Sequence, residues 1–194
     1  MSQSPTERKN RPTRKQVLLV GLIAVLGYTL DQLTKFWVLN NMSEGETIPV
    51  LPPLLNWHFV RNPGAAFSIG TEFTWVFTII MVIVAGYVIF KLRTTTRTIW
   101  LVAMGALLGG VFGNLTDRLI QEPGFGVGHV IDFIAFPNFA VFNIADSLIV
   151  CSMIGIGLLL VTGTPMNEEE AAKLREEKAR SAEPNTSNDS ATHE

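Results

Sequence analysis

The chain has 194 residues, of which 47% are hydrophobic, and its formal net charge is −2. With a positive mean hydropathy, it is more apolar than a soluble domain of this size usually is. The charge gives no indication of nucleic-acid binding, because a basic beginning and an acidic end cancel. The only cysteine, Cys151, can form no internal disulfide.

The apolar residues gather in four blocks, at residues 17–39, 73–90, 99–115 and 139–161. Each is close to the ~20 residues that a helix needs to cross a hydrocarbon core ~30 Å thick, so we predict four transmembrane helices. The first block, preceded by basic residues, also resembles a cleavable signal peptide. Against this alternative, the apolar run continues past Asp31 to Leu39, no small-x-small cleavage site follows, and removal would leave an odd number of helices.

The basic residues predict how these helices are oriented. Five of them lie within residues 8–15, before the first block, and three more lie within residues 91–97, between the second and third blocks. By the positive-inside rule, both termini and this short link are cytoplasmic. The links at residues 40–72 and 116–138 then lie on the opposite side of the membrane.

Three regions are therefore expected along the chain. Residues 1–16 form a basic, disordered cytoplasmic head, residues 17–162 the membrane domain, and residues 163–194 a charged cytoplasmic tail. Within the tail, residues 168–180 are rich in helix formers with opposite charges three and four apart, which predicts a helix. The Ser-, Asn- and Thr-rich remainder is expected to be disordered.

The two extracytoplasmic links contain patterns typical of short strands. Residues 47–61 combine β-formers with Pro residues, and residues 130–134 are apolar and β-branched. The predicted fold class is thus an all-α membrane protein, a bundle of four transmembrane helices with a small extracytoplasmic β-structure.

Asp31 and Lys35 are the first charged residues inside an apolar block. Because they lie four positions apart, both side chains project from the same face of the helix. One interpretation is an interfacial ion pair in which Lys35 extends to the membrane surface. The other is a pair that orients a functional site or contacts its substrate.

The third block ends in several glycines followed by Asn114, Asp117 and Arg118. The glycines allow close helix packing. The three polar side chains are expected to form hydrogen bonds across the bundle, in structural support more than in direct chemistry.

Asp146 is an ionisable residue in the last apolar block, which makes it a functional-site candidate. If the helix starts at residue 139, Asp146 lies ~10 Å below its beginning, a depth that water can reach. Asn143 is on roughly the same face, and a second carboxylate, Asp132, lies in the preceding link. The structural alternative is that Asp146 forms a buried ion pair with Arg118 or Lys35.

Other reactive side chains are weaker candidates. His129 could act as a base, but one loop histidine beside two acids is more often incidental. Cys151 has no histidine in its helix, so a thiolate nucleophile is not expected. No set of His, Cys and carboxylate residues has the spacing of metal ligands.

Five short motifs occur in a fixed order: DQLTK at 31–35, NPGAAF at 62–67, GNLTDR at 113–118, VIDF at 130–133 and FNIAD at 142–146. Together they resemble the bacterial lipoprotein signal peptidase family, also called signal peptidase II. The resemblance spans about residues 17–162. The basic head and the charged tail lie outside it.

The resemblance implies an aspartic endopeptidase of the bacterial cytoplasmic (inner) membrane, with a small extracytoplasmic β-structure beside the site. Such enzymes remove signal peptides from prolipoproteins by cutting before a cysteine that carries diacylglyceryl. Asp132 and Asp146 match the catalytic pair. The positions that shape the site or meet the substrate are Asp31, Lys35, Asn62, Gly64, Asn114, Asp117, Arg118, Asn143 and Ala145. The implied partners are lipid-modified precursors and membrane lipid, with no cofactor and no nucleic acid, and a monomer is expected.

Three other functions are compatible with parts of the pattern. A serine protease would use Ser147 or Ser68 with Lys35 as base, although the neighbouring Asp31 favours the charged lysine. A proton-coupled transporter would relay protons through the carboxylates, although these gather near one membrane face. A non-catalytic assembly subunit would leave the convergence of two acids from separate segments without explanation.

Overall fold

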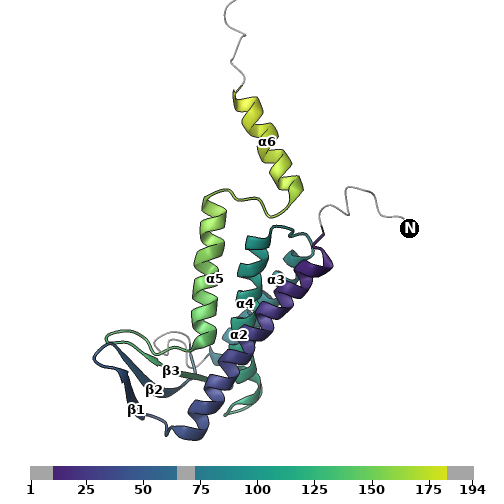
Figure 1. Ribbon diagram of the computed structural model, residues 1–194. Coiled ribbons are helices and arrows are strands. Elements are labelled where there is room, and N and C mark those ends of the chain that lie inside the picture. The colour runs from purple at the N-terminus through teal and green to yellow at the C-terminus, as the bar shows by residue number, and fades with distance from the viewer. Residues whose placement is uncertain (1–10, 65–72, 183–194) are drawn as a thin grey trace, which may run out of the picture.

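A computed structural model describes residues 11–64 and 73–182, and Figure 1 shows the arrangement of the elements. The helices are α2 (Arg14–Asn41), α3 (Thr74–Leu92), α4 (Thr98–Ile120), α5 (Ile144–Val161) and α6 (Glu168–Ala182). The strands are β1 (Thr47–Leu51), β2 (Leu55–Asn62) and β3 (Val130–Ala135). The four predicted helices of the bundle, α2 to α5, and the small sheet are therefore confirmed.

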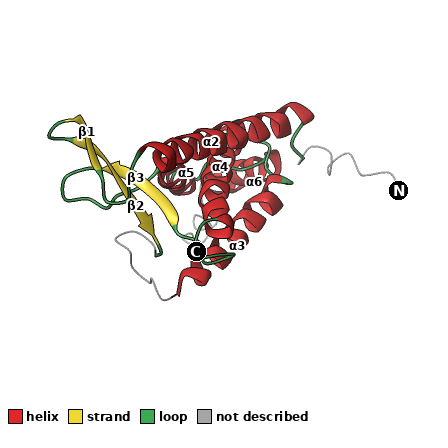
Figure 2. Ribbon diagram, turned by 90° about the horizontal axis from the view of Figure 1, so that it is seen from below, coloured by secondary structure: helices red, strands yellow, loops and turns green. Residues whose placement is uncertain are grey.

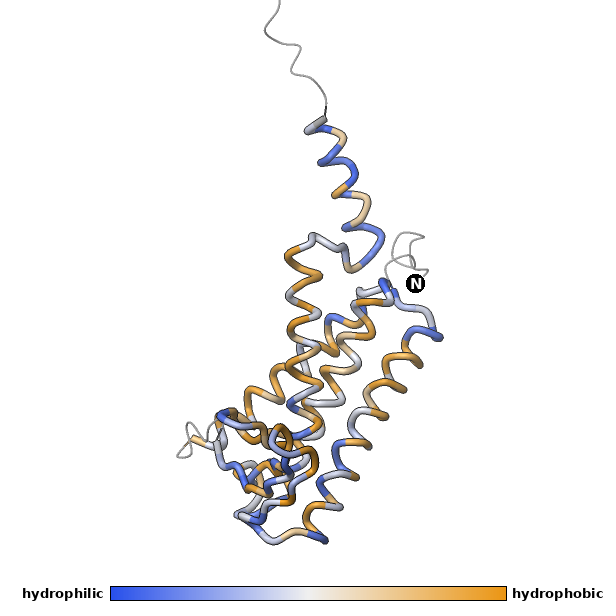
Figure 3. Tube along the Cα trace, turned by 60° about the vertical axis from the view of Figure 1, so that its left-hand side comes forward, coloured by the Kyte–Doolittle hydropathy of each residue, from blue (hydrophilic) through white to orange (hydrophobic). Residues whose placement is uncertain are grey.

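The helices α2 to α5 are long and apolar enough to cross a membrane. α4 is the most buried of the four and packs against α2, α3 and α5. The outer faces of the bundle carry many exposed large hydrophobic side chains, and Figure 3 shows apolar residues along the helices. A surface of this kind is stable in hydrocarbon and not in water, so the fold is that of a membrane protein.

Close packing of α4 against its neighbours depends on its glycines. A Cβ atom at Gly110 would lie 2.5 Å from the carbonyl oxygen of Ala145 at the beginning of α5. A Cβ at Gly113 would lie 2.5 Å from Oδ2 of Asp31 in α2. Both distances are below van der Waals contact, so only glycine allows α2 and α5 to approach α4 at this level.

The three strands form an antiparallel sheet in the order β1-β2-β3. The sheet lies at the end of the bundle opposite α6 and, seen from that end in Figure 2, projects to one side of the helices. It is attached to the end of α2 by a small hydrophobic cluster. The buried members of the cluster are Val38, Met42, Phe59, Ile131 and Phe133.

The segment after α5 folds back onto the link between α3 and α4. The carbonyl of Met166 accepts hydrogen bonds from the backbone N–H groups of Thr96 and Arg97, at 3.0 and 3.1 Å. Asn167 donates to the carbonyl of Thr94 at 3.0 Å, and the buried Trp100 donates to that of Thr164 at 3.2 Å. The predicted helix of the tail follows as α6.

Two element boundaries differ from the prediction. α2 begins at Arg14, three residues before the expected start of the membrane domain, because the side chain of Thr13 caps its first turn. The helix expected at residues 139–161 begins only at Ile144. The reason is that Phe142 pairs with Ile134 of β3 and Asn143 caps the helix. The prediction that Asp146 lies ~10 Å inside its helix is therefore wrong, because Asp146 is in the first turn.

Candidate active site

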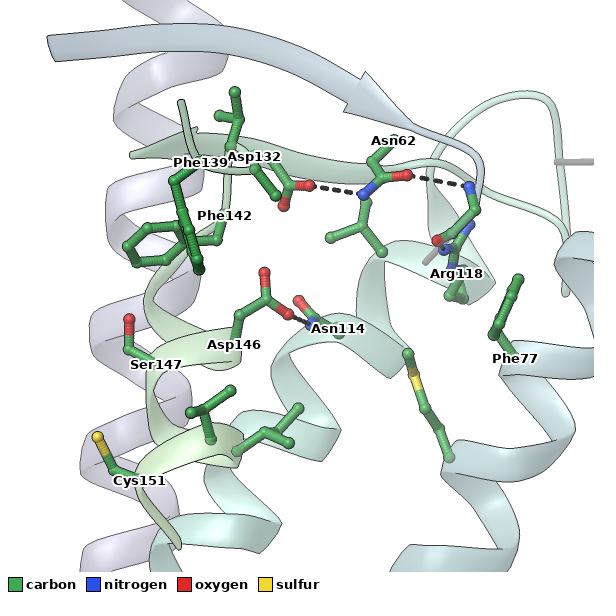
Figure 4. Close-up of a pocket in the computed structure, with 17 residues that line it drawn as sticks. Asn62, Phe77, Asn114, Arg118, Asp132, Phe139, Phe142, Asp146, Ser147 and Cys151 are labelled. Carbon is green, nitrogen blue, oxygen red and sulfur yellow. Dashed lines mark hydrogen bonds between the residues drawn. The ribbon is translucent and has the colours of Figure 1, made fainter. Parts of the chain in front are cut away.

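Asp132 and Asp146 come from different elements and face the same space. Asp132 lies in β3, opposite Val60 of β2, where the register between the two strands shifts. Irregularities of this kind change the direction in which strand side chains point. Asp146 lies in the first turn of α5. Figure 4 shows the two carboxyl groups pointing toward each other across a cavity.

Two amide side chains bind the carboxyl group of Asp132. Nδ2 of Asn62 donates to Oδ2 at 2.8 Å, and Nδ2 of Asn143 donates to Oδ1 at 2.7 Å. Both bonds favour the ionised form. Burial opposes them, and with the negative charge of Asp146 it raises the pKa of Asp132 to about 7. Asp132 can therefore hold a proton near neutral pH.

Asp146 is bound by another set of donors. Nδ2 of Asn114 donates to its Oδ1 at 2.7 Å, and the backbone N–H of Asn143 donates to its Oδ2 at 3.1 Å. In return, Oδ1 of Asn143 accepts from the backbone N–H of Asp146 at 2.9 Å, which completes a capping box. Asn143 thus contacts both acids and fixes the beginning of α5 between them.

Lys35 lies at the centre of a buried ionic cluster behind the two acids. Its Nζ is 2.8 Å from Oδ2 of Asp31, 2.8 Å from Oδ2 of Asp117 and 2.8 Å from Oδ1 of Asn114. The predicted ion pair between Asp31 and Lys35 is present, but only 2% of the Lys35 surface is exposed, so the expectation that Lys35 extends to the membrane surface is wrong. The lysine pairs with Asp31 and Asp117, and Asp146 is instead bound by Asn114 and Asn143.

Arg118 attaches the segment after β2 to α4. Its Nη1 donates to the carbonyls of Pro63 and Gly128, at 3.0 Å each, and its Nη2 donates to the carbonyl of Gly64. Oδ1 of Asn62 accepts from the backbone N–H of Gly64 at 3.0 Å, which orients the amide toward Asp132. As predicted, Asn114 and Asp117 bond across the bundle, to Lys35 of α2. Arg118 instead bonds to carbonyls of the two links at the sheet end. Asn114 additionally contacts Asp146.

The two acids line a cavity of about 490 Å³ between α3, α4, α5 and β3. Polar side chains gather at the sheet end, and apolar side chains form most of the remaining wall. Residues 139–142 and the α3 side chains were not predicted to be site residues, because apolar residues in or beside a membrane helix are expected to contact lipid. These additional lining residues are Phe77, Met81, Phe139, Ala140, Val141 and Phe142.

The other reactive side chains occupy less favourable positions. Ser147 lines the cavity, but its hydroxyl donates to the carbonyl of Asn143 at 3.0 Å. Cys151 lies one turn further along α5 in the same wall. Ser68 is outside the described residues. Within residues 11–64 and 73–182, no group of three or more His, Cys, Asp or Glu side chains could hold a metal ion.

Comparisons with known proteins match both the sequence and the fold. The sequence model of a family described as signal peptidase (SPase) II matches residues 23–162. A lipoprotein signal peptidase from Leifsonia xyli is 52% identical over 145 residues, covering 74% of this chain and 67% of that protein. One from Streptomyces griseus is 43% identical over 151 residues, covering 77% of this chain and 76% of the relative. A solved bacterial membrane enzyme superimposes with a TM-score of 0.70 at 30% identity, covering 80% of this chain and 93% of that one.

Proposed function

Because the chain belongs to the signal peptidase II family, we propose that it is an aspartic endopeptidase that removes signal peptides from diacylglyceryl-modified prolipoproteins. Cleavage occurs just before the lipidated cysteine. One observation carries this proposal: a buried carboxyl group from β3 and a half-buried one from the first turn of α5 face one cavity beside the apolar bundle. Membership of the family makes the chain a signal peptidase, and the two acids supply a mechanism.

In this mechanism, Asp132 and Asp146 share one proton. Two carboxyl groups facing each other cannot both be ionised without repulsion, so the pair offers an acid and a base at the same pH. The proton belongs to the pair and not to either residue. The raised pKa of Asp132 is consistent with a singly protonated pair near neutral pH.

The ionised carboxylate takes a proton from a water molecule, whose oxygen attacks the carbonyl carbon of the scissile peptide bond. The protonated carboxyl donates to the carbonyl oxygen, which gains negative charge as the tetrahedral intermediate forms. When the C–N bond breaks, the proton taken from water passes to the leaving nitrogen. The products are a carboxyl group on the signal peptide and a free amino group on the lipidated cysteine.

The shape of the site supports a substrate that approaches from the membrane. The cavity wall follows α5 from Asp146 past Ser147 to Cys151, beside faces of the bundle that are exposed and apolar. A signal peptide is itself an apolar segment, and the acyl chains of the modified cysteine can remain in lipid while the scissile bond reaches the acids. Membrane lipid is therefore a partner of the reaction.

We further propose that the site faces the extracytoplasmic side of the cytoplasmic membrane. The first turn of α2 and the link between α3 and α4 carry the basic residues, and both lie at the end of the bundle opposite the sheet. The positive-inside rule places that end in the cytoplasm. We also propose that the protein acts as a monomer, because the amide groups that bind Asp132 and Asp146 come from elements of a single chain.

The substrate class is tested by offering the purified, reconstituted protein two forms of one precursor, with and without the diacylglyceryl group. We expect rapid cleavage of the modified precursor and a new N-terminus at the modified cysteine. The unmodified precursor should be cleaved at least about tenfold more slowly, because the loss of ~1.4 kcal/mol of binding energy already has that effect. Equal rates for the two forms would contradict a lipid requirement.

A further inference from the structure

We propose that Asp31 and Asp117, joined by Lys35, are positioning residues that set the distance and direction between the two catalytic carboxyl groups. This inference rests on the function proposed above and assigns to the ionic cluster one defined task. Each carboxylate of the cluster binds the backbone of the residue that immediately precedes a catalytic aspartate.

The geometry is the same on both sides of the cluster. Oδ1 of Asp31 accepts a hydrogen bond from the backbone N–H of Ala145, at 2.8 Å, and Ala145 precedes Asp146. Oδ2 of Asp117 accepts one from the backbone N–H of Ile131, at 3.1 Å, and Ile131 precedes Asp132. Hydrogen bonds to ionised acceptors are stronger than those between neutral groups. The beginning of α5 and the beginning of β3 are therefore each bonded to a charged group.

Lys35 joins these two bonds into one unit. Its ammonium contacts Asp31 and Asp117 at 2.8 Å each, so α2 and α4 hold the two acceptors at a fixed separation. Its third contact, to Oδ1 of Asn114, leaves the amide nitrogen of Asn114 directed at Asp146. The cluster thus reaches Asp146 in two ways. Asp31 binds the backbone N–H of Ala145, and Lys35 orients Asn114, which binds the carboxyl group of Asp146.

The burial of the cluster distinguishes positioning from substrate binding. The exposed fractions of Asp31, Lys35 and Asp117 are 0%, 2% and 1%. None of the three is among the described residues that line the cavity, and neither are Ala145 and Ile131. The cluster therefore has no surface to offer a substrate. It affects the reaction through the backbone at Ala145 and Ile131, to which it is hydrogen-bonded.

Asp117 allows the cleanest test, because one of its oxygens makes both essential contacts. Oδ2 accepts from Ile131 and from Lys35, whereas Oδ1 has only a long contact, 3.4 Å, to Nε2 of Gln32. Asp117→Asn can keep the bound oxygen in place and lose the charge. Asp117→Leu has a similar volume and loses the acceptor. Comparison of these two variants isolates the acceptor oxygen, which binds both Ile131 and Lys35.

The readout is the pH profile of kcat for cleavage of the lipid-modified precursor. The profile rises on its acidic limb and falls on its alkaline limb, at the two apparent pKa values of the pair. The difference between these pKa values grows with the interaction between the two acids, which depends on their distance. We expect Asp117→Leu to bring the limbs closer together and to lower kcat about 100-fold, as a displacement of ~1 Å does, with KM nearly unchanged. Asp117→Asn should keep the wild-type separation of the limbs. The charged groups around the acids, Asp31, Lys35 and Arg118, are the same in both variants.

Thr78→Val is the control for a general loss of stability. Thr78 is buried and donates to the carbonyl of Gly126 at 2.7 Å, outside the ionic cluster. This variant should lower the Tm but leave the separation of the limbs unchanged. If Asp117→Leu keeps the wild-type separation of the two limbs, the proposal is overturned. A raised KM with a normal kcat would also overturn it, because that result indicates a substrate contact.

Hydrogen exchange tests the positioning bonds without any enzymatic step. In the wild-type protein, the amides of Ile131 and Ala145 should be strongly protected, and Asp117→Leu should accelerate exchange at Ile131 more than at Ala145. Fast exchange of both amides in the wild type would overturn the proposal even if the Leu variant cannot be recovered folded. If Asp132→Asn and Asp146→Asn keep their activity while these amides are protected, the proposed function fails and the positioning bonds remain.

Discussion

Asp132 is subject to two opposing influences at the scale of single residues. The amides of Asn62 and Asn143 donate to its oxygens and favour the carboxylate. Burial and the charge of Asp146 favour the protonated acid and outweigh the amides, so the pKa is raised to about 7. A raised pKa at a cavity wall is typical of a group that transfers protons.

The pKa of Asp132 predicts how cleavage depends on pH. Above about pH 7 the pair loses its shared proton, and no acid is left to donate to the carbonyl oxygen. We therefore expect kcat to fall as the pH is raised from 7 to 9. A rate that stays constant up to pH 9 would contradict a shared proton with this pKa.

The same shift has a consequence for stability. Between its unfolded value of 3.8 and about 7, the folded protein keeps a proton that the unfolded chain has lost, so the stability of the wild type falls as the pH rises through this window. Asp132→Asn removes this titration. The Tm of the variant minus that of the wild type should accordingly be larger at pH 8 than at pH 5, as measured by thermal unfolding in detergent.

At the scale of elements, the site depends on how closely α4 approaches α5. Gly110 packs directly against the backbone of Ala145, one residue before Asp146. A methyl group there forces the beginning of α5 outward and separates Asn114 from the carboxyl group that it binds. Overpacking of this kind typically costs about 1–3 kcal/mol.

Gly110→Ala is therefore expected to lower both the Tm and the rate of cleavage. Gly155→Ala is a matched control, because Gly155 lies in α5 and a Cβ there would meet nothing within 4 Å. The control should keep wild-type activity and gain slightly in stability, since alanine favours helix. Equal behaviour of the two variants would show that close packing at Gly110 is not needed.

The start of α5 was predicted incorrectly from the sequence, at residue 139 instead of Ile144. Length and composition predicted four membrane helices, and the resemblance to the signal peptidase II family implied that Asp132 and Asp146 form a pair. The apolar residues on both sides of Asn143 concealed the end of the segment at Phe142, which bonds to β3. The signal was present in Asn143 followed three residues later by Asp146, a capping pattern at a helix start.

The ionic cluster could be predicted only in part. The four-residue spacing of Asp31 and Lys35 places them on one face of a helix, but it does not determine whether that face meets lipid or protein. Their burial depends on Gly113 of α4, which leaves space for Asp31, and on the separate contact with Asp117. Contacts between segments so distant in sequence are a property of the packed bundle.

At the scale of the whole molecule, the two ends of the bundle differ in chemistry. One end carries the sheet and the two acids, and the other carries the basic link and the segment that leads to α6. The basic residues at the second end support the proposed orientation. In that orientation, the reaction takes place outside the cytoplasm.

Single-cysteine labelling tests this orientation in intact cells. In a Cys151→Ser background, a membrane-impermeant maleimide should label Glu46→Cys, in the turn before β1, and should not label Lys178→Cys, in α6. Both positions are exposed, so permeabilised cells should label at both. Labelling at Lys178→Cys in intact cells would reverse the proposed orientation.

The claim that Asp132 and Asp146 together carry out the cleavage is tested most directly by the initial rate of signal-peptide release from a lipid-modified precursor. The wild type should be compared with Asp132→Asn, Asp146→Asn and, as a cavity-lining control, Ser147→Ala. Because each carboxyl group acts as acid or base, either Asn variant should lose at least about 100-fold in kcat while keeping its fold, and Ser147→Ala should remain active. Near-normal turnover by either Asn variant would contradict the account.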